Sequence, residues 1–130
     1  MEEVYEFLKT SGVYYLATVD GALPKVRPFG TVLLFEGRLY IQSGKSKAVS
    51  QQIAVNPHIA ISAMIGGKWL RVEAEAVEDP RTEPKVQMLD VYPELRSIYD
   101  ATDPNTVVWY LKDAVATVEE YGAEKKTYRF

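Results

Sequence analysis

The stretch that decides the fold runs from Lys25 to Pro57 and reads KVRPFGTVLLFEGRLYIQSGKSKAVSQQIAVNP. Arg27 opens a long apolar run, and a second strand-like run ends in the cationic segment Gly44–Lys47. A helical pattern follows at once, over about residues 46–55. Backbone amides, hydroxyls and ammonium groups that meet where a strand gives way to a helix are suited to bind a phosphate monoester. The sequence therefore predicts a phosphate-bearing cofactor at this junction.

Length and composition indicate one ordinary globular domain over residues 1–130. The net charge of -3 gives no general attraction for nucleic acid, so we expect no nucleic-acid partner. The chain has no cysteine, which excludes disulfides and thiol catalysis and suits a reducing cytoplasm. The acidic, amphipathic N-terminus differs from a secretory signal, and the apolar runs fall short of the ~20 residues of a membrane helix. We therefore expect a cytoplasmic protein without a membrane partner.

The first two thirds of the chain alternate strand-like runs with turn signals. Asp20-Gly21 between two such runs is a strong hairpin signal. Pro28 and Gly30 interrupt the second run and predict a bulge or kink near residues 28–30. The predicted elements are a helix over 2–11, strands over 13–19, 24–35 and 38–43, a helix over 46–55, and strands over 58–65 and 68–77.

The last third begins with a charged, helical region over residues 79–98, which Pro93 divides. The run from 106 to 122 favours a strand because it is rich in valine and aromatic residues. Its part from 114 to 121 fits helix or strand, and strand is preferred; residues 125–130 form a last strand. The predicted fold is mostly β with short helices, a six- to seven-stranded antiparallel β-barrel.

The cationic segment and Arg27 carry the phosphate hypothesis. Ser43, Lys45, Ser46 and Lys47 could hold a doubly charged phosphate through charge-assisted hydrogen bonds. The alternative is a solvated turn with a serine cap before the helix. Arg27, on the strand expected to pair with the one that leads into this loop, could add a planar fork for phosphate or a ring carbonyl. Its alternative is an outward-facing strand arginine.

Two further features suit a flat ring. Pro28, Phe29 and Gly30 leave backbone polar groups unpaired beside the strand, which a heteroaromatic ring with imide edges could use. These residues fit a barrel corner equally well. Trp69 could stack on a bound ring, and core or interface packing is the alternative.

The chain offers few acid–base groups of its own, so its catalytic residues stay unknown. His58 is the only histidine, and an exposed or capping role suits it better than catalysis. No metal-ligand set, serine nucleophile with a base, P-loop or dinucleotide fingerprint is present. Any reaction would therefore depend on a cofactor.

The order LATVDGALPKVRPFG, LYIQSGKSK, NPHIAI and WLRVEAEA resembles the pyridoxamine 5'-phosphate oxidase-like FMN-binding split barrels. The resemblance is strongest to their short, nitroimidazole-resistance-type members. It covers residues 1 to about 79 well and the last third loosely. It implies a Greek-key split barrel of the FMN-binding type and a homodimer with FMN at the subunit interface.

The resemblance also implies roles for single residues. Arg27 matches the arginine that opens the flavin-contacting strand, and Ile41 and Gln42 match positions beside the ribityl chain. Ser46 and Lys47 match the pair that holds the phosphate, while Trp69 matches a position that contacts the flavin of the other subunit. The stretch along the isoalloxazine comprises Pro28, Phe29, Gly30, Thr31 and Val32.

The function implied is that of an FMN-dependent oxidoreductase, which passes hydride or electrons from NAD(P)H to a small acceptor. The chain has only TYRF where the vitamin B6 oxidases carry a Trp/Arg segment, so that reaction is not expected. The alternatives are a non-catalytic flavin carrier or sensor, a deazaflavin- or haem-binding split barrel, and a plain dimerisation module.

Overall fold

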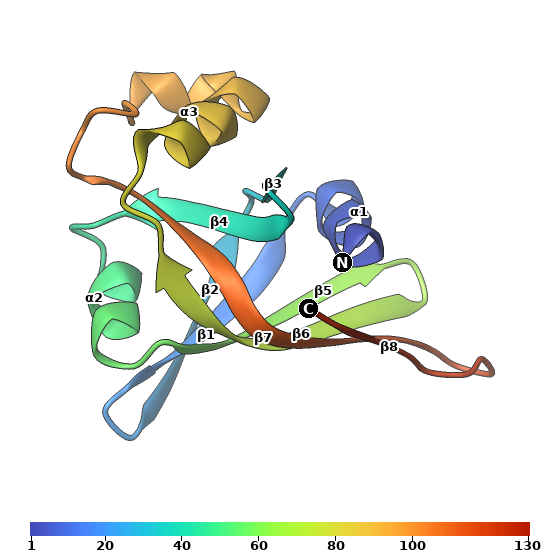
Figure 1. The fold of residues 1–130 in the computed structure, drawn as a ribbon. Coiled ribbons are helices and arrows are strands. Elements are labelled where there is room, and N and C mark those ends of the chain that lie inside the picture. The colour runs from blue at the N-terminus through green and yellow to red at the C-terminus, as the bar shows by residue number, and fades with distance from the viewer.

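The computed structural model describes all 130 residues as helices packed on one antiparallel sheet (Figure 1). The first half of the chain contains α1 (Glu2–Ser11), β1 (Tyr14–Asp20), β2 (Leu23–Phe29), β3 (Leu33–Phe35), β4 (Arg38–Gly44) and α2 (Ala48–Val55). The second half contains β5 (His58–Ile65), β6 (Lys68–Glu78), α3 (Thr82–Val91), the 3₁₀ helix η1 (Pro93–Ser97), β7 (Thr106–Glu120) and β8 (Lys126–Arg129).

The sheet curls into a barrel that stays open between β2 and β3. The strand order is β2-β1-β5-β6-β7-β4-β3, and β8 pairs with β7. The 15-residue β7 reaches three partners because its first third pairs with β4, its last third with β8 and most of its length with β6. The predicted split barrel of antiparallel strands with short helices is confirmed.

The strand count is eight, where the sequence predicted six or seven. The predicted strand over 24–35 is two strands, because residues 30–32 leave the ladder and bond to distant side chains instead. The Tyr14 hydroxyl donates to the Thr31 carbonyl at 2.6 Å. The Val32 amide donates to the Tyr92 hydroxyl at 3.0 Å. The kink predicted near residues 28–30 is therefore a complete break just after Phe29.

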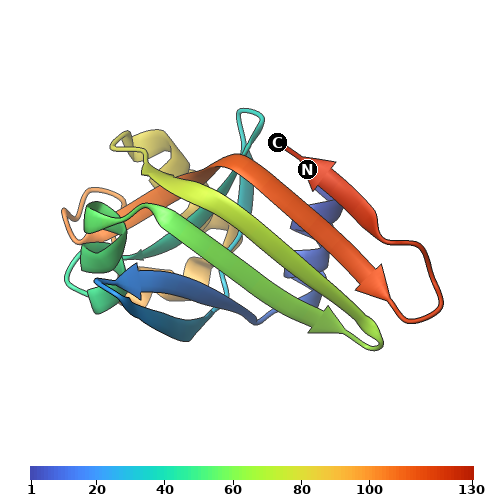
Figure 2. The ribbon, with the colours of Figure 1, turned by 90° about the horizontal axis from the view of Figure 1, so that it is seen from below.

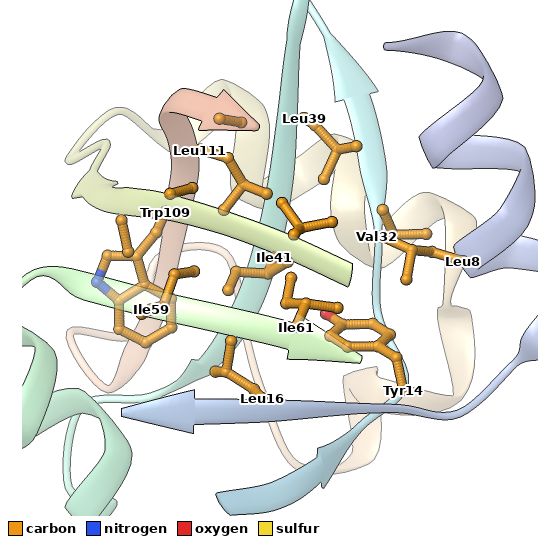
Figure 3. Close-up of a cluster of buried hydrophobic side chains, with 14 of the residues drawn as sticks. Leu8, Tyr14, Leu16, Val32, Leu39, Ile41, Ile59, Ile61, Trp109 and Leu111 are labelled. Carbon is orange, nitrogen blue, oxygen red and sulfur yellow. The ribbon is translucent and has the colours of Figure 1, made fainter. Parts of the chain in front are cut away.

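One apolar core fills the barrel (Figure 3). Leu16, Ile41 and Leu39 are fully buried, and each contributes on the order of 2 kcal/mol by leaving water. The helix α1 closes one end of the barrel with Val4 and Leu8, the apolar stripe expected from its spacing.

The C-terminal third follows the predictions. The helical region divides at Pro93 into α3 and η1. Residues 114–120 extend β7, and Ala114 and Ala116 are buried while their neighbours are not, the period of two that a strand requires. No helix is long and apolar enough to cross a membrane.

One face of the sheet has no helix over it. Figure 2 looks onto this face, formed by β1, β5, β6 and β7, with α1 behind the strands. Tyr15 of β1, Met64 of β5 and Val26 of the neighbouring β2 are each more than half exposed on this side. Cross-strand pairing sets Val26 opposite Ala17, and Ala17 opposite Ala60, so apolar side chains line up over β2, β1 and β5. On β6 the same outer face carries charged residues, namely Arg71, Glu73 and Glu75.

Candidate functional site

A cavity of about 270 Å³ lies where the break after β2, the end of β4 and the η1 segment meet. Seven of its ten lining residues were candidates from the sequence, and they come from two separate stretches of the chain. The seven are Pro28, Phe29, Gly30, Thr31, Gln42, Ser43 and Lys47. The fold therefore brings the ring-contacting stretch and the cationic loop to one place.

The wall at residues 30–32 is held rigidly by side chains. The backbone N–H of Gln42 donates to the Thr31 hydroxyl at 3.2 Å, and this bond connects the wall to β4. Burial raises the pKa of the Tyr14 hydroxyl well above its ordinary value, so this group stays a neutral donor to the Thr31 carbonyl. Such a wall is preorganised for a ligand because its own polar groups are already fixed.

The cationic loop is braced by Asn105. The Lys45 amide donates to the Asn105 carbonyl at 2.7 Å, and the Ser46 amide donates to its side-chain oxygen at 2.9 Å. The Lys47 amide donates to the Gly44 carbonyl at 3.1 Å. The expectation that backbone amides of this loop bind a phosphate is thus wrong for Lys45, Ser46 and Lys47. The helix α2 begins at Ala48 after Lys47, with no side-chain cap. Its first amides therefore lack the serine cap that the alternative reading required.

The two lysines of the loop face different surroundings. Lys47 lines the 270 Å³ cavity. The Lys45 ammonium pairs with the Glu78 carboxylate at 3.2 Å and lines another cavity. Within this chain, Lys47 is thus the lysine placed for a bound anion.

Arg27 lies on the inner side of β2, so it is not the outward-facing arginine of the alternative reading. Its guanidinium donates to the Thr18 hydroxyl at 2.7 Å and to the Gln52 side-chain oxygen at 2.8 Å. Burial lowers the pKa of Arg27, and the side chain is only half-exposed. These contacts join the split edge of the barrel to α2, and Arg27 does not line the cavity.

Other candidates also lie outside the cavity. Val32 and Ile41 are core residues with 1% and 0% exposure. Ser46 is exposed in the loop. Trp69 lies on the outer face and packs against Tyr121, with ring centroids 5.1 Å apart. His58 is exposed at the start of β5, as expected from its position after Asn56-Pro57.

Three residues of the cavity were missed from the sequence. The lining is completed by residues 95–99, here called the η1 segment, through Leu95 of η1 and through Ile98 and Tyr99 directly after it. Tyr99 is 7% exposed, yet its hydroxyl makes no hydrogen bond within the protein. Their spacing of i, i+3 and i+4 marks one apolar helical face, a signal that could have singled them out.

The cavity combines apolar walls with one cation and several neutral polar groups. Phe29, Leu95 and Ile98 supply the apolar surface, and Lys47 supplies the charge. The only other titratable side chain in the lining is that of Tyr99. The chain contains no cluster of three or more His, Asp or Glu side chains arranged to hold a metal ion. This arrangement suits a planar group with an anionic end.

Comparison with known proteins agrees with this fold. The family model of pyridoxamine 5'-phosphate oxidase matches residues 1–116. This chain belongs to the pyridoxamine 5'-phosphate oxidase family. Among curated proteins, none matches it significantly.

Solved structures place it more closely within the family. A NimC/NimA family protein from Clostridium acetobutylicum is 37% identical and superposes with a TM-score of 0.96, over 100% of this chain and 92% of that chain. This match confirms the short, nitroimidazole-resistance-type resemblance expected from the sequence.

More distant structures share the fold alone. A pyridoxamine 5'-phosphate oxidase-related, FMN-binding protein from Nostoc punctiforme is 13% identical, with a TM-score of 0.64 over 99% of this chain and 93% of that one. A haem-binding protein from Mycobacterium smegmatis is 17% identical, with a TM-score of 0.72 over 98% of this chain and 57% of that one.

Proposed function

We propose that this protein is a cytoplasmic FMN-dependent oxidoreductase, a single FMN-binding domain over residues 1–130 that works as a homodimer. The observation that carries the proposal is the meeting of seven sequence-derived candidates in one cavity with Lys47 in its lining. Family membership supports it, and so does the FMN-binding relative with the same fold.

The residues present fit FMN. The uncapped start of α2 and the Lys47 ammonium suit the phosphate. Gln42 and Ser43 offer polar groups for the ribityl chain, and the unpartnered Tyr99 hydroxyl offers one more. Phe29 and Ile98 offer apolar surface for the ring. Arg27 would act from outside the cavity, by holding α2 in place through Gln52.

The chain's own residues would bind and orient rather than react. When bound, the flavin would supply hydride or electron transfer between NAD(P)H and a small acceptor. The fixed wall at residues 30–32 would set the orientation of the ring, and the η1 segment would exclude water from one side of it.

The size of the cavity supports a dimeric site. Its volume of about 270 Å³ lies below the roughly 300–1,000 Å³ of complete small-molecule sites. One chain would then supply only part of the pocket, and a partner would supply the rest. The apolar part of the outer face, over β1, β2 and β5, provides a surface for that partner, and Trp69 lies beside it on β6.

Flavin titration of lysine variants tests the cofactor assignment. We expect Lys47→Ala to weaken FMN binding by about tenfold or more, as for loss of a charge-assisted hydrogen bond. Lys45→Ala is the matched control because Lys45 pairs with Glu78 outside the cavity, and it should change affinity about twofold at most. Equal affinities for the two variants would contradict the role of Lys47.

A non-catalytic flavin carrier is the second candidate, favoured by the absence of any carboxylate or histidine from the cavity lining. Anaerobic stopped-flow mixing with NADH and NADPH separates the two functions. Rapid bleaching of the flavin band supports the oxidoreductase, and a flavin that stays oxidised supports the carrier. The absorbance spectrum distinguishes both from haem, whose usual histidine ligand could come only from His58, outside the cavity.

A further inference from the structure

A second, larger cavity lies on the other side of the cationic loop. Its volume is about 550 Å³, within the range of small-molecule sites, and it shares no lining residue with the 270 Å³ cavity. It lies between α2, the end of β6 and the first residues of β7. The proposed flavin function makes no use of it.

Trp109 provides an unpartnered donor on its wall. The side chain is 3% exposed, and its indole N–H donates to no group of the protein. Every fully occluded side-chain nitrogen or oxygen in the chain has a hydrogen-bond partner, so this nitrogen retains contact with open space. Trp109 lines the 550 Å³ cavity, and its nitrogen points away from the neighbouring core side chains in Figure 3. An N–H that faces a cavity and has no partner in the protein can donate to an acceptor placed opposite it.

The other polar groups of the lining restrict the ligand further. Lys45 and Glu78 are its only charged residues, and their ion pair leaves no net charge. The Ser50 hydroxyl already donates to the Gly44 carbonyl at 2.7 Å, and the side-chain amide of the exposed Gln51 donates to the Ser46 carbonyl at 3.5 Å. Most of the remaining surface is apolar, from residues such as Ile53, Ala54 and Val107. A charged ligand would lose its hydration without compensation there.

We propose that this cavity binds a neutral, mainly apolar small molecule whose carbonyl oxygen accepts a hydrogen bond from the Trp109 indole N–H. The apolar body of the ligand packs against Ile53, Ala54 and Val107. The ligand does not compete with the flavin for space, because no residue is common to the two cavities.

The probe pair 4-chromanone and chroman tests this proposal, since the two compounds differ by one carbonyl group. The readout is the indole N–H resonance of Trp109 in ¹⁵N-labelled protein. The chain has two tryptophans, so a Trp69→Phe variant leaves this resonance alone in the indole region and assigns it. We expect 4-chromanone to shift it saturably, and chroman to bind about fivefold more weakly, the ratio for one neutral hydrogen bond.

Two substitutions on α2 locate the binding. Ala54 is an exposed helix residue that lines the cavity, so Ala54→Phe should fill part of it and weaken 4-chromanone binding at least tenfold. Val55→Phe is the matched control, because Val55 is exposed on the same helix and does not line this cavity. Both variants should keep the affinity of the protein for FMN.

Three results of the binding measurements would overturn the proposal. They are the absence of a saturable shift, equal affinity for both compounds, and 4-chromanone binding that survives Ala54→Phe. A change of oligomeric state in Ala54→Phe would also overturn it, because a partner chain would then fill the cavity. Loss of FMN binding in Lys47→Ala bears only on the flavin proposal and leaves this one standing.

Discussion

Gly44 shows how tightly a single residue is fitted into the candidate site. A Cβ atom built there would lie 3.1 Å from the Asn105 side-chain nitrogen and 3.2 Å from the ring and hydroxyl of Tyr99. Asn105 braces the cationic loop, and Tyr99 lines the 270 Å³ cavity proposed for the flavin. The absence of a side chain at residue 44 therefore lets the loop and the η1 segment approach each other.

Gly44→Ala should displace Tyr99 or Asn105. We expect a loss of about 1–3 kcal/mol in unfolding free energy, typical of overpacking, together with weaker FMN binding. Urea unfolding and flavin titration measure the two effects. Gly67→Ala is the matched control, because a Cβ there would meet no atom within 4 Å, and its stability should change by about 0.5 kcal/mol at most. Unchanged stability in Gly44→Ala would show that Tyr99 moves aside without cost.

Asp79 is a buried carboxylate that joins β6 to α3. It accepts hydrogen bonds from the Arg81 guanidinium at 2.9 Å and from the Tyr40 hydroxyl at 2.7 Å. The bonds from Arg81 are the main cause that lowers its pKa from 3.8 to about 2. Because the folded pKa lies below the unfolded one, the stabilisation is complete above about pH 4 and is lost as the pH falls towards 2.

Asp79→Asn should remove about 2 kcal/mol of stability at neutral pH and flatten the decline between pH 4 and 2. Chemical unfolding at a series of pH values measures both. Asp90→Asn is the control, since Asp90 pairs with Arg96 on the exposed surface and should contribute about 0.5 kcal/mol at most. A variant that keeps the wild-type pH dependence would show that another carboxylate governs acid unfolding.

At the scale of elements, turns were predictable because their signals are local. Gly21, Gly37 and Gly66 all adopt positive φ, and each ends a strand pattern that can be read from adjacent residues. The break at residues 30–32 was predictable only as a kink. Its length depends on Tyr14 and Tyr92, whose hydroxyls replace the missing ladder bonds. Nothing near residue 31 in the sequence indicates the second of these partners.

The lining of the candidate site likewise contains residues that the sequence could predict and residues that it could not. Seven lining residues could be predicted from the sequence. They belong to a Gly/Pro interruption and to a cationic loop, and each of these is recognised from its own local residues. Leu95, Ile98 and Tyr99 come from a segment about fifty residues later, and their contact with the cavity is a property of the folded chain. Asn105 is a similar case, since its bonds to Lys45 and Ser46 have no local signature.

Substitution of Tyr92, the residue directly after α3, tests whether α3 fixes the wall at residues 30–32 in place. Its hydroxyl accepts from the Val32 amide at 3.0 Å and donates to the Val32 carbonyl at 3.3 Å. Tyr92→Phe would leave these buried backbone groups unpaired, which should cost about 1–3 kcal/mol in urea unfolding and weaken FMN binding through the loosened wall. Tyr121→Phe is the control because Tyr121 is almost fully exposed. Full FMN affinity in Tyr92→Phe would mean that the wall at residues 30–32 keeps its shape without α3.

At the scale of the whole molecule, the helices lie on three sides of the barrel and leave the outer face bare (Figure 2). The proposed second copy of the chain would account both for the small flavin cavity and for the exposed apolar side chains of this outer face. A dimer would cover Tyr15, Val26 and Met64. It would also bring residues of the partner to the flavin cavity of each chain. Full FMN binding is therefore expected to depend on formation of the proposed dimer.

Val26→Glu tests this link. Val26 is 68% exposed on the outer face, so a carboxylate there should leave the monomer folded but would be buried without a partner in a dimer. We expect sedimentation velocity to give a dimer for the wild type and a monomer for Val26→Glu, with FMN affinity reduced at least tenfold in the monomer. Val91→Glu, on α3 and away from this face, should stay dimeric and keep its flavin. A Val26→Glu monomer that binds FMN as tightly as the wild type would show that one chain holds the complete site.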